Sequence, residues 1–125
     1  MRLLLDSHVV LWLVLDNPKL GSAIRGVIAE SAGTVHVSVA SLWELRIKAA
    51  LGKLLLPDGF HRILIDSGMT ILPIDLHHID ALADMPRHHN DPFDRMLIAQ
   101  ALADDLTLVS ADRMVTLYDA PVLWS

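Results

Sequence analysis

The chain has 125 residues, of which 53% are hydrophobic, and it carries a formal net charge of −5 with no cysteine. This composition excludes a disordered chain and predicts a single domain over residues 1–125 with a sizeable core. The lack of cysteine excludes disulfides and thiolate metal sites. The negative charge excludes a nucleic-acid binder that relies mainly on basic side chains.

The N-terminal residues have the basic start and apolar run of a signal sequence but lack its other features. Asp6 and His8 interrupt the apolar run. No small-residue cleavage site follows, and the run is too short and too polar to cross a membrane. We therefore expect no membrane association and a cytoplasmic location.

The first half of the chain alternates short apolar runs with helical patterns. Leu3-Leu4-Leu5 is uniformly apolar, as expected of a strand buried on both faces. The β-branched run 35–39 predicts a second strand, and Asp6-Ser7 suits the start of a helix. The helices predicted in this half are 7–15, 23–31 and 41–51.

The second half continues the alternation. Asp91-Pro92 predicts a helix start, because Asp suits the N-cap and Pro the first helical position. Pro121 places the last strand at a sheet edge, and Asp112 predicts the start of a short helical turn. The predicted helices are 60–67, 76–85 and 92–104, and the predicted strands are 70–74, 106–110 and 121–124.

Strands that alternate with helices predict an α/β fold. We expect a three-layer sandwich whose central, mostly parallel sheet of four or five short strands has helices on both faces. In such sheets the ligand site lies beyond the carboxyl ends of the strands.

Acidic residues fall at that edge of the predicted sheet. Asp6 follows the first strand, Asp112 follows the fourth, and Glu44 lies in the helix after the second strand. Asp94 lies in the first turn of its helix. It leads a stripe that we expect to face the core, comprising Leu97, Ile98, Ala101 and Leu102.

Each acid taken singly also has an ordinary explanation. Asp6 and Asp112 suit helix N-caps, Asp91 and Asp94 suit the helix dipole, and Ser41 with Glu44 fits a capping box. Together, however, four converging carboxylates repel one another strongly unless a cation lies between them. Because the ligands are oxygens only, the cation expected is Mg²⁺ or Mn²⁺.

The order and spacing of these motifs resemble PIN-domain proteins, most closely the VapC-type toxins of prokaryotic type II toxin–antitoxin pairs. The similar segments are Leu3-Leu4-Leu5-Asp6-Ser7-His8-Val9, 38–44, Asp91-Pro92-Phe93-Asp94-Arg95 with its continuation to residue 101, and 108–112. The resemblance implies a PIN-like fold and a metal-dependent endoribonuclease that hydrolyses RNA phosphodiester bonds. It also implies a homodimer and an antitoxin that covers the active site.

By this resemblance the catalytic and metal-binding set is Asp6, Glu44, Asp94 and Asp112. We expect Asp6, Asp94 and Asp112 to bind the metal directly and Glu44 either to bind it through water or to orient the nucleophile. The candidates for outer positions are Asp91, Ser7 and Ser110, and the candidates for RNA contact are Arg46, Lys48, Arg95 and Arg113. The adjacent His77 and His78 lack a partner at ligand spacing in the sequence, which disfavours a zinc site.

Competing interpretations remain. A receiver-like domain requires a Lys after the last strand, but no Lys follows Lys53. A haloacid-dehalogenase-like phosphatase requires Asp at position 8, where this chain has His8. The main alternative is a non-catalytic PIN-fold module that binds RNA or protein, and the presence of all four acids argues against it.

Overall fold

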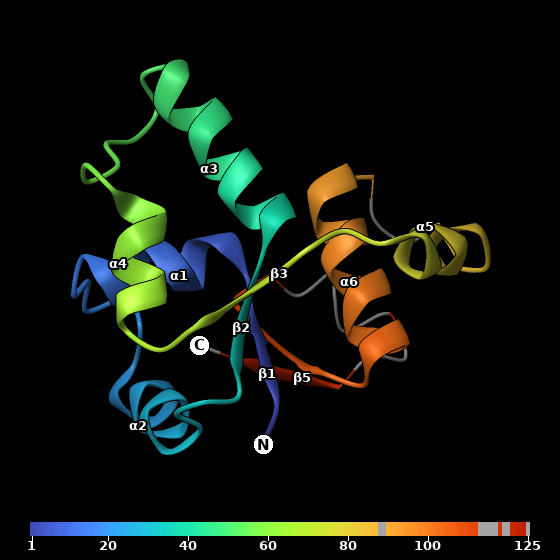
Figure 1. Ribbon diagram of the computed structural model, residues 1–125, viewed down its shortest axis with the longest axis horizontal. Helices are drawn as coiled ribbons and strands as arrows, with labels where there is room; N and C mark the ends of the chain where they lie inside the picture. The colour runs from blue at the N-terminus through green and yellow to red at the C-terminus, as the bar shows by residue number, and fades with distance from the viewer. Residues whose placement is uncertain (88–89, 113–117, 119–120, 125) are drawn as a thin grey trace.

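A computed structural model describes residues 1–87, 90–112, 118 and 121–124, in which short strands alternate with helices (Figure 1). The strands are β1 (Leu3–Leu5), β2 (Val35–Ser38), β3 (Thr70–Leu72), β4 (Thr107–Ser110) and β5 (Val122–Trp124). The helices are α1 (Ser7–Val14), α2 (Ser22–Glu30), α3 (Val39–Ala50), α4 (Phe60–Asp66), α5 (Leu76–Ala83) and α6 (Pro92–Asp104). The predicted α/β class is confirmed.

The strands form one parallel sheet in the order β3-β2-β1-β4-β5. The central strand is β1, whose Leu5 lies opposite Val37 of β2 and Val109 of β4. β5 is an edge strand, as Pro121 predicted. Because all strands run in the same direction, the carboxyl ends of β1, β2 and β4 meet at one edge of the sheet.

Both faces of the sheet are covered by helices. Leu3 and Leu5 face a buried cluster that includes side chains of α1, α2 and α4. Leu4 points to the opposite face, where it packs with Leu97 and Ile98 of α6, because successive side chains of a strand alternate between faces. α5 packs against α6 (Figure 1). The structure is thus the predicted three-layer arrangement.

The predicted start of the third helix at residue 41 is wrong. α3 begins at Val39, directly after β2, and Ser38 is its N-cap, whose Oγ accepts the Ala40 N–H at 3.0 Å. Ser41 therefore lies inside the first turn and is buried. The hydroxyl that caps the helix comes three residues earlier than the sequence pattern suggested.

The core-facing side of α6 is shorter than its sequence pattern indicates, and α3 also exposes apolar side chains. Leu97 and Ile98 are buried as expected, but Leu102, placed on the same stripe, is 40% exposed. In α3, Ile47 and Leu51 are exposed, because the C-terminal half of this helix extends beyond the sheet (Figure 1). Apolar side chains at both places remain on the surface.

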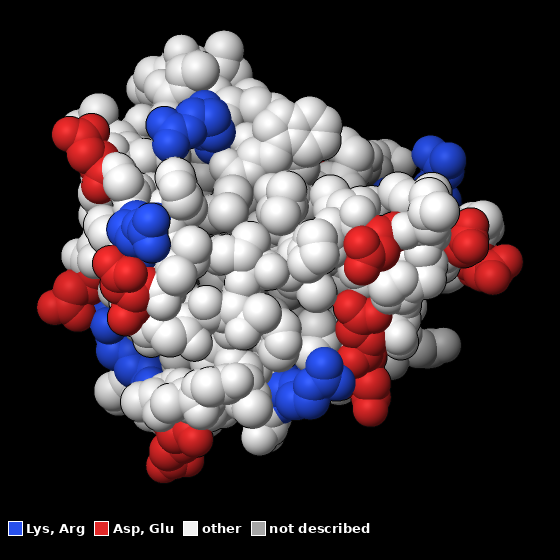
Figure 2. All heavy atoms as spheres, viewed as in Figure 1, with Lys and Arg blue, Asp and Glu red and all other residues white. Residues whose placement is uncertain are grey.

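Charged side chains are unevenly placed on the face shown in Figure 2. They lie around its edge, and its centre over β3 and the neighbouring ends of α3 and α6 is uncharged. Lys and Arg are scattered on this face and form no continuous basic surface. Within the described residues, no helix has the length and apolar character needed to cross a membrane.

Candidate active site

Three carboxylates from distant parts of the chain converge at the carboxyl edge of the sheet. Asp6 directly follows β1, Glu44 lies in α3 after β2, and Asp94 lies in the first turn of α6. One oxygen from each lies within 4.8 Å of one from each of the others, and all three residues are buried. The parallel sheet produces this convergence, since the strand ends and the helix starts share one edge.

The carboxylates line a cavity of about 360 Å³. Sequence reasoning did not select two of the lining residues, His8 and Ala111. His8 directly follows Asp6-Ser7 in the first turn of α1, so its position in the sequence was an available signal. The lining residues are Asp6, Ser7, His8, Glu44, Lys48, Asp91, Asp94, Ala111 and Asp112.

Asp6 occupies the N-cap position of α1, but its side chain makes no capping hydrogen bond. Its carboxylate instead accepts hydrogen bonds from Ser110 Oγ at 2.7 Å and from Ser7 Oγ at 3.2 Å. Burial raises the pKa of Asp6, and the neighbouring Glu44 raises it further, although hydrogen bonds from Ser110 and the Ser7 backbone partly offset the rise. The hydrogen bonds therefore do not fully compensate the buried charge.

Glu44 does not form the capping box with Ser41 that the sequence allowed. Its Oε1 accepts the Ser7 hydroxyl at 2.7 Å, and its Oε2 accepts from Lys48 Nζ at 3.0 Å. The Ser7 hydroxyl has one hydrogen, and its contact with Glu44 is shorter than its contact with Asp6. Ser7 thus bridges two of the carboxylates.

Asp91 is the N-cap of α6, as predicted. Its Oδ1 accepts the Phe93 N–H at 2.9 Å and the Asp94 N–H at 3.4 Å, and Pro92 occupies the first helical turn. The cap fixes where α6 begins and so directs Asp94 toward the other carboxylates. Because Asp91 also lines the cavity, its capping role does not exclude contact with a ligand.

Asp112 lines the same cavity but is not among the three carboxylates that converge within 4.8 Å. Its backbone N–H donates to Ser110 Oγ at 3.0 Å, and that hydroxyl donates in turn to Asp6. The group that converges within 4.8 Å therefore includes Glu44, whereas Asp112 lines the same cavity outside this group; which acids bind a metal directly stays a prediction. The helical turn predicted after Asp112 lies at 113–117, outside the described residues.

Of the four cations predicted to contact RNA, Lys48 lines the acidic cavity. Arg46 lines a separate hollow with Leu42 and Phe60, and therefore does not face the carboxylates. Arg95 Nη1 donates to the Pro86 carbonyl at 3.1 Å and contacts the Tyr118 hydroxyl at 3.3 Å. Arg113 lies outside the described residues.

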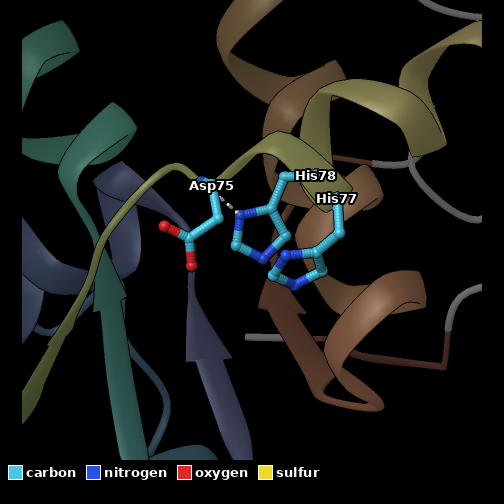
Figure 3. A group of neighbouring side chains, drawn as sticks. All are labelled: Asp75, His77 and His78. Carbon is cyan, nitrogen blue, oxygen red and sulfur yellow. Dashed lines mark hydrogen bonds between the residues drawn. The ribbon is translucent and has the colours of Figure 1, made fainter.

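A second group of potential ligands lies at the start of α5 (Figure 3). Atoms of Asp75, His77 and His78 are within 4.8 Å of one another. Asp104, at the end of α6, contacts both rings through His77 Nε2 at 2.6 Å and His78 Nε2 at 2.8 Å. The sequence argument that these histidines lack partners is therefore wrong, because the fold brings two carboxylates beside them.

The hydrogen bonds of His78 nevertheless disfavour metal binding by its ring. Its Nδ1 accepts the backbone N–H of Asp75 at 3.0 Å, so the neutral ring carries its hydrogen on Nε2 and donates it to Asp104. Neither nitrogen then has a lone pair free for a metal. Partial burial raises the pKa of Asp104, but the hydrogen bonds from His78 and His77 outweigh it and the net pKa is lowered.

The fold and the acidic cavity together define a parallel α/β protein in which three carboxylates gather at the carboxyl edge of the sheet. The sequence model of the PIN domain matches residues 3–121, and the chain belongs to this family. No curated protein sequence matches the chain significantly.

Several solved structures share the fold. VapBC2 from Rickettsia felis bound to a promoter DNA fragment is 12% identical, with a TM-score of 0.74, and the match covers 99% of this chain and 98% of that one. DNA-bound VapBC from Salmonella typhimurium is 18% identical, with a TM-score of 0.70 and the same coverage. A toxin-antitoxin complex from Klebsiella pneumoniae is 13% identical, with a TM-score of 0.66, over 98% of this chain and 96% of that one. At these identities the likeness shows a common fold.

Proposed function

We propose that this chain is a metal-dependent endoribonuclease, the toxin component of a type II toxin–antitoxin module. The observation that carries the proposal is the convergence of Asp6, Glu44 and Asp94 within 4.8 Å in one cavity. Two carboxylates about 4 Å apart repel by roughly 4 kcal/mol at an effective dielectric constant near 20. Membership of the PIN domain family supports a nuclease.

The chemistry of the donors fits a hard divalent cation. All the converging ligand atoms are carboxylate oxygens, and the chain has no cysteine to supply a thiolate ligand. Oxygen ligands of this kind suit Mg²⁺ or Mn²⁺. Asp6, Asp94 and Glu44 would hold the ion, and Asp112 lines the same cavity.

The bound ion would supply Lewis-acid stabilisation of charge on the phosphate and would acidify water for attack on the phosphodiester. The protein's own groups prepare this site. Ser110 and Ser7 orient the Asp6 carboxylate, and Ser7 with Lys48 orients Glu44. Their hydrogen bonds hold the acids in place before substrate arrives, so little reorganisation remains for the reaction.

RNA is the proposed substrate although the chain is acidic. Of the three cations named from the sequence that the structure describes, Lys48 is the one that lines the cavity, and its charge would favour a polyanionic substrate. The divalent ion provides the remaining positive charge. Binding of this kind depends on the ion more than on basic side chains.

We further propose a cognate antitoxin and a homodimer. The names of similar structures describe VapBC and toxin-antitoxin complexes. This chain also exposes apolar side chains along α3, and Trp43, which is 59% exposed, packs edge-on against Phe93 at 5.1 Å. Beside them lies an apolar cavity of about 230 Å³. Exposed apolar surface of this kind is typical of protein interfaces.

The enzymatic proposal is tested by measuring RNA cleavage in the presence of Mn²⁺. Three proteins are compared: the parent, Asp94→Asn and Asp80→Asn. Asp80 is an exposed acid of α5 that lies outside the cavity, so it controls for loss of one charge. We expect the parent and Asp80→Asn to cleave and Asp94→Asn to be inactive. If Asp94→Asn cleaves as fast as the parent, the proposed mechanism is wrong.

Thermal melting separates the enzyme from the non-catalytic alternative. An ion that binds only the folded chain raises the melting temperature, and we expect Mn²⁺ to do so for the parent but not for Asp94→Asn. An unchanged melting temperature, together with no cleavage, would favour a module that only binds RNA or protein.

Light scattering at micromolar concentration tests the proposed homodimer, and a monomer would contradict it.

A further inference from the structure

Lys48 is placed differently from the other cations named in the sequence. Among the described residues that line the acidic cavity, it is the only Lys or Arg. Its Nζ lies 3.0 Å from Glu44 Oε2, in a contact where the Glu44 side chain is only 7% exposed and the Lys48 side chain 29%. The ammonium group therefore lies among the carboxylates.

We propose that Lys48 is the second cation of this site, and that its ammonium group takes the place of a second metal ion. The inference rests on the proposed function and specifies how many ions the site holds. The carboxylates of Asp6, Glu44 and Asp94 converge within 4.8 Å, and Lys48 places a positive charge 3.0 Å from one of them.

An ordinary helical ion pair does not account for this contact. Exposed pairs four residues apart contribute little, because water screens both charges. Here the acid is buried, it lies within 4.8 Å of two other carboxylates, and its second oxygen already accepts the Ser7 hydroxyl. Ser7 and Lys48 thus hold the two oxygens of Glu44 from opposite ends, which fixes the plane of the carboxylate.

The same contact explains how Lys48 limits the number of ions. A second divalent ion beside Glu44 would meet a positive charge 3.0 Å from its ligand oxygen, and like charges at such distances repel strongly in a partly buried site. A compact ammonium group supplies positive charge without requiring further ligands. Lys48 is therefore a positioning residue that acts through Glu44.

The experiment counts Mn²⁺ ions bound to the full chain by calorimetry and native mass spectrometry, with electron paramagnetic resonance to detect coupled ion pairs. It compares the parent with Lys48→Met, which removes the charge and keeps the length, and with Lys48→Arg, which keeps the charge. Lys53→Met is the matched control, because Lys53 is exposed and does not line the cavity. Asp6→Asn tests whether the ion binds at the carboxylates at all.

We expect one ion in the parent, in Lys48→Arg and in Lys53→Met, and two ions with a coupled spectrum in Lys48→Met. Two ions in the parent, or one in Lys48→Met, would overturn the proposal while leaving the nuclease intact. If the parent binds no Mn²⁺ and its titration coincides with that of Asp6→Asn, the proposed function itself fails. The ion count is independent of activity, so a merely structural role for Lys48 would not change it.

Discussion

Two groups of side chains in this molecule each bring possible metal ligands close together, but the two groups differ in their electrostatics. Asp6, Glu44 and Asp94 form one group, and Asp75, His77 and His78 form the other, each with possible ligand atoms within 4.8 Å. In the first, burial raises the pKa of Asp6. In the second, the hydrogen bonds of His78 and His77 lower the pKa of the adjoining Asp104.

The difference shows why proximity alone does not identify a metal site. The hydrogen bonds from His78 and His77 lower the net pKa of Asp104, and both nitrogens of His78 are engaged, so this group is satisfied without a cation. The carboxylates of the cavity are gathered at a cost that the two serines and Lys48 only partly offset. We therefore interpret the histidine group as a link between α5 and α6 and the cavity as the functional site.

The largest expected effect is on metal binding when Asp6 loses its charge. Asp6→Asn should weaken Mn²⁺ binding by more than about 100-fold, because even outer-shell partners of metal sites contribute roughly 10- to 100-fold. Calorimetric titration measures the affinity. His77→Ala, which alters the other group, is the comparison and should leave the affinity unchanged. Equal losses of Mn²⁺ affinity in both variants would contradict the assignment of the metal site to the cavity.

Asp6 should also make the metal-free protein less stable as pH rises. Its folded pKa is raised, so the folded state binds more protons than the unfolded state above about pH 4. Stability conferred by the protonated form is therefore lost as pH increases from about 4 through the raised pKa. The loss is about 1.4 kcal/mol for every pH unit by which the folded pKa exceeds the unfolded one. Urea unfolding in EDTA at several pH values measures it.

Asp6→Asn is the control for this pH dependence, since the amide does not titrate. We expect the parent to lose stability relative to Asp6→Asn as pH rises, and added Mn²⁺ to restore the parent alone. Parallel stability curves for the two proteins in EDTA would show that the buried carboxylate is already compensated. The cavity would then resemble the histidine group.

The histidine group should contribute stability without affecting the metal. Asp104→Asn replaces a carboxylate that accepts from two rings with an amide whose oxygen accepts from one, so one of the two ring contacts is lost and the negative charge between the rings is removed. The expected cost is about 1–3 kcal/mol, measured by urea unfolding. Asp105→Asn is the matched control at an exposed neighbour. Equal stability of the two variants would show that the link is not needed.

The sequence predicted the fold and the converging carboxylates because local patterns determine them. Asp6 directly follows an apolar strand, and Asp91-Pro92 marks a helix start, so the positions of Asp6 and Asp94 follow from the parallel sheet. The elements were placed to within a few residues. The start of α3 was missed because a serine stands at both 38 and 41, and each suits an N-cap.

Side-chain direction and long-range partners could not be predicted. Arg46 and Lys48 lie in the same helix, yet only Lys48 faces the acids, because a difference of two positions turns the side chain to the opposite side of a helix. The contact between His78 and Asp104 joins residues 26 apart. Only the packing of α5 on α6 brings them together, and no sequence spacing indicates it.

The smallest predicted effect tests the cavity through the hydroxyl of a single residue, Ser110. Its hydroxyl accepts the Asp112 N–H at 3.0 Å and donates to Asp6 Oδ2 at 2.7 Å, so it links Asp6 to Asp112. Ser110→Ala removes this link and should weaken Mn²⁺ binding roughly 10-fold, the lower end for outer-shell partners. Ser67→Ala, which removes an exposed hydroxyl bonded to the Ile63 carbonyl, should leave the affinity unchanged. If the two variants bind Mn²⁺ equally well, the orientation of Asp6 does not depend on Ser110, and burial by the surrounding strands is sufficient to hold the acid in place.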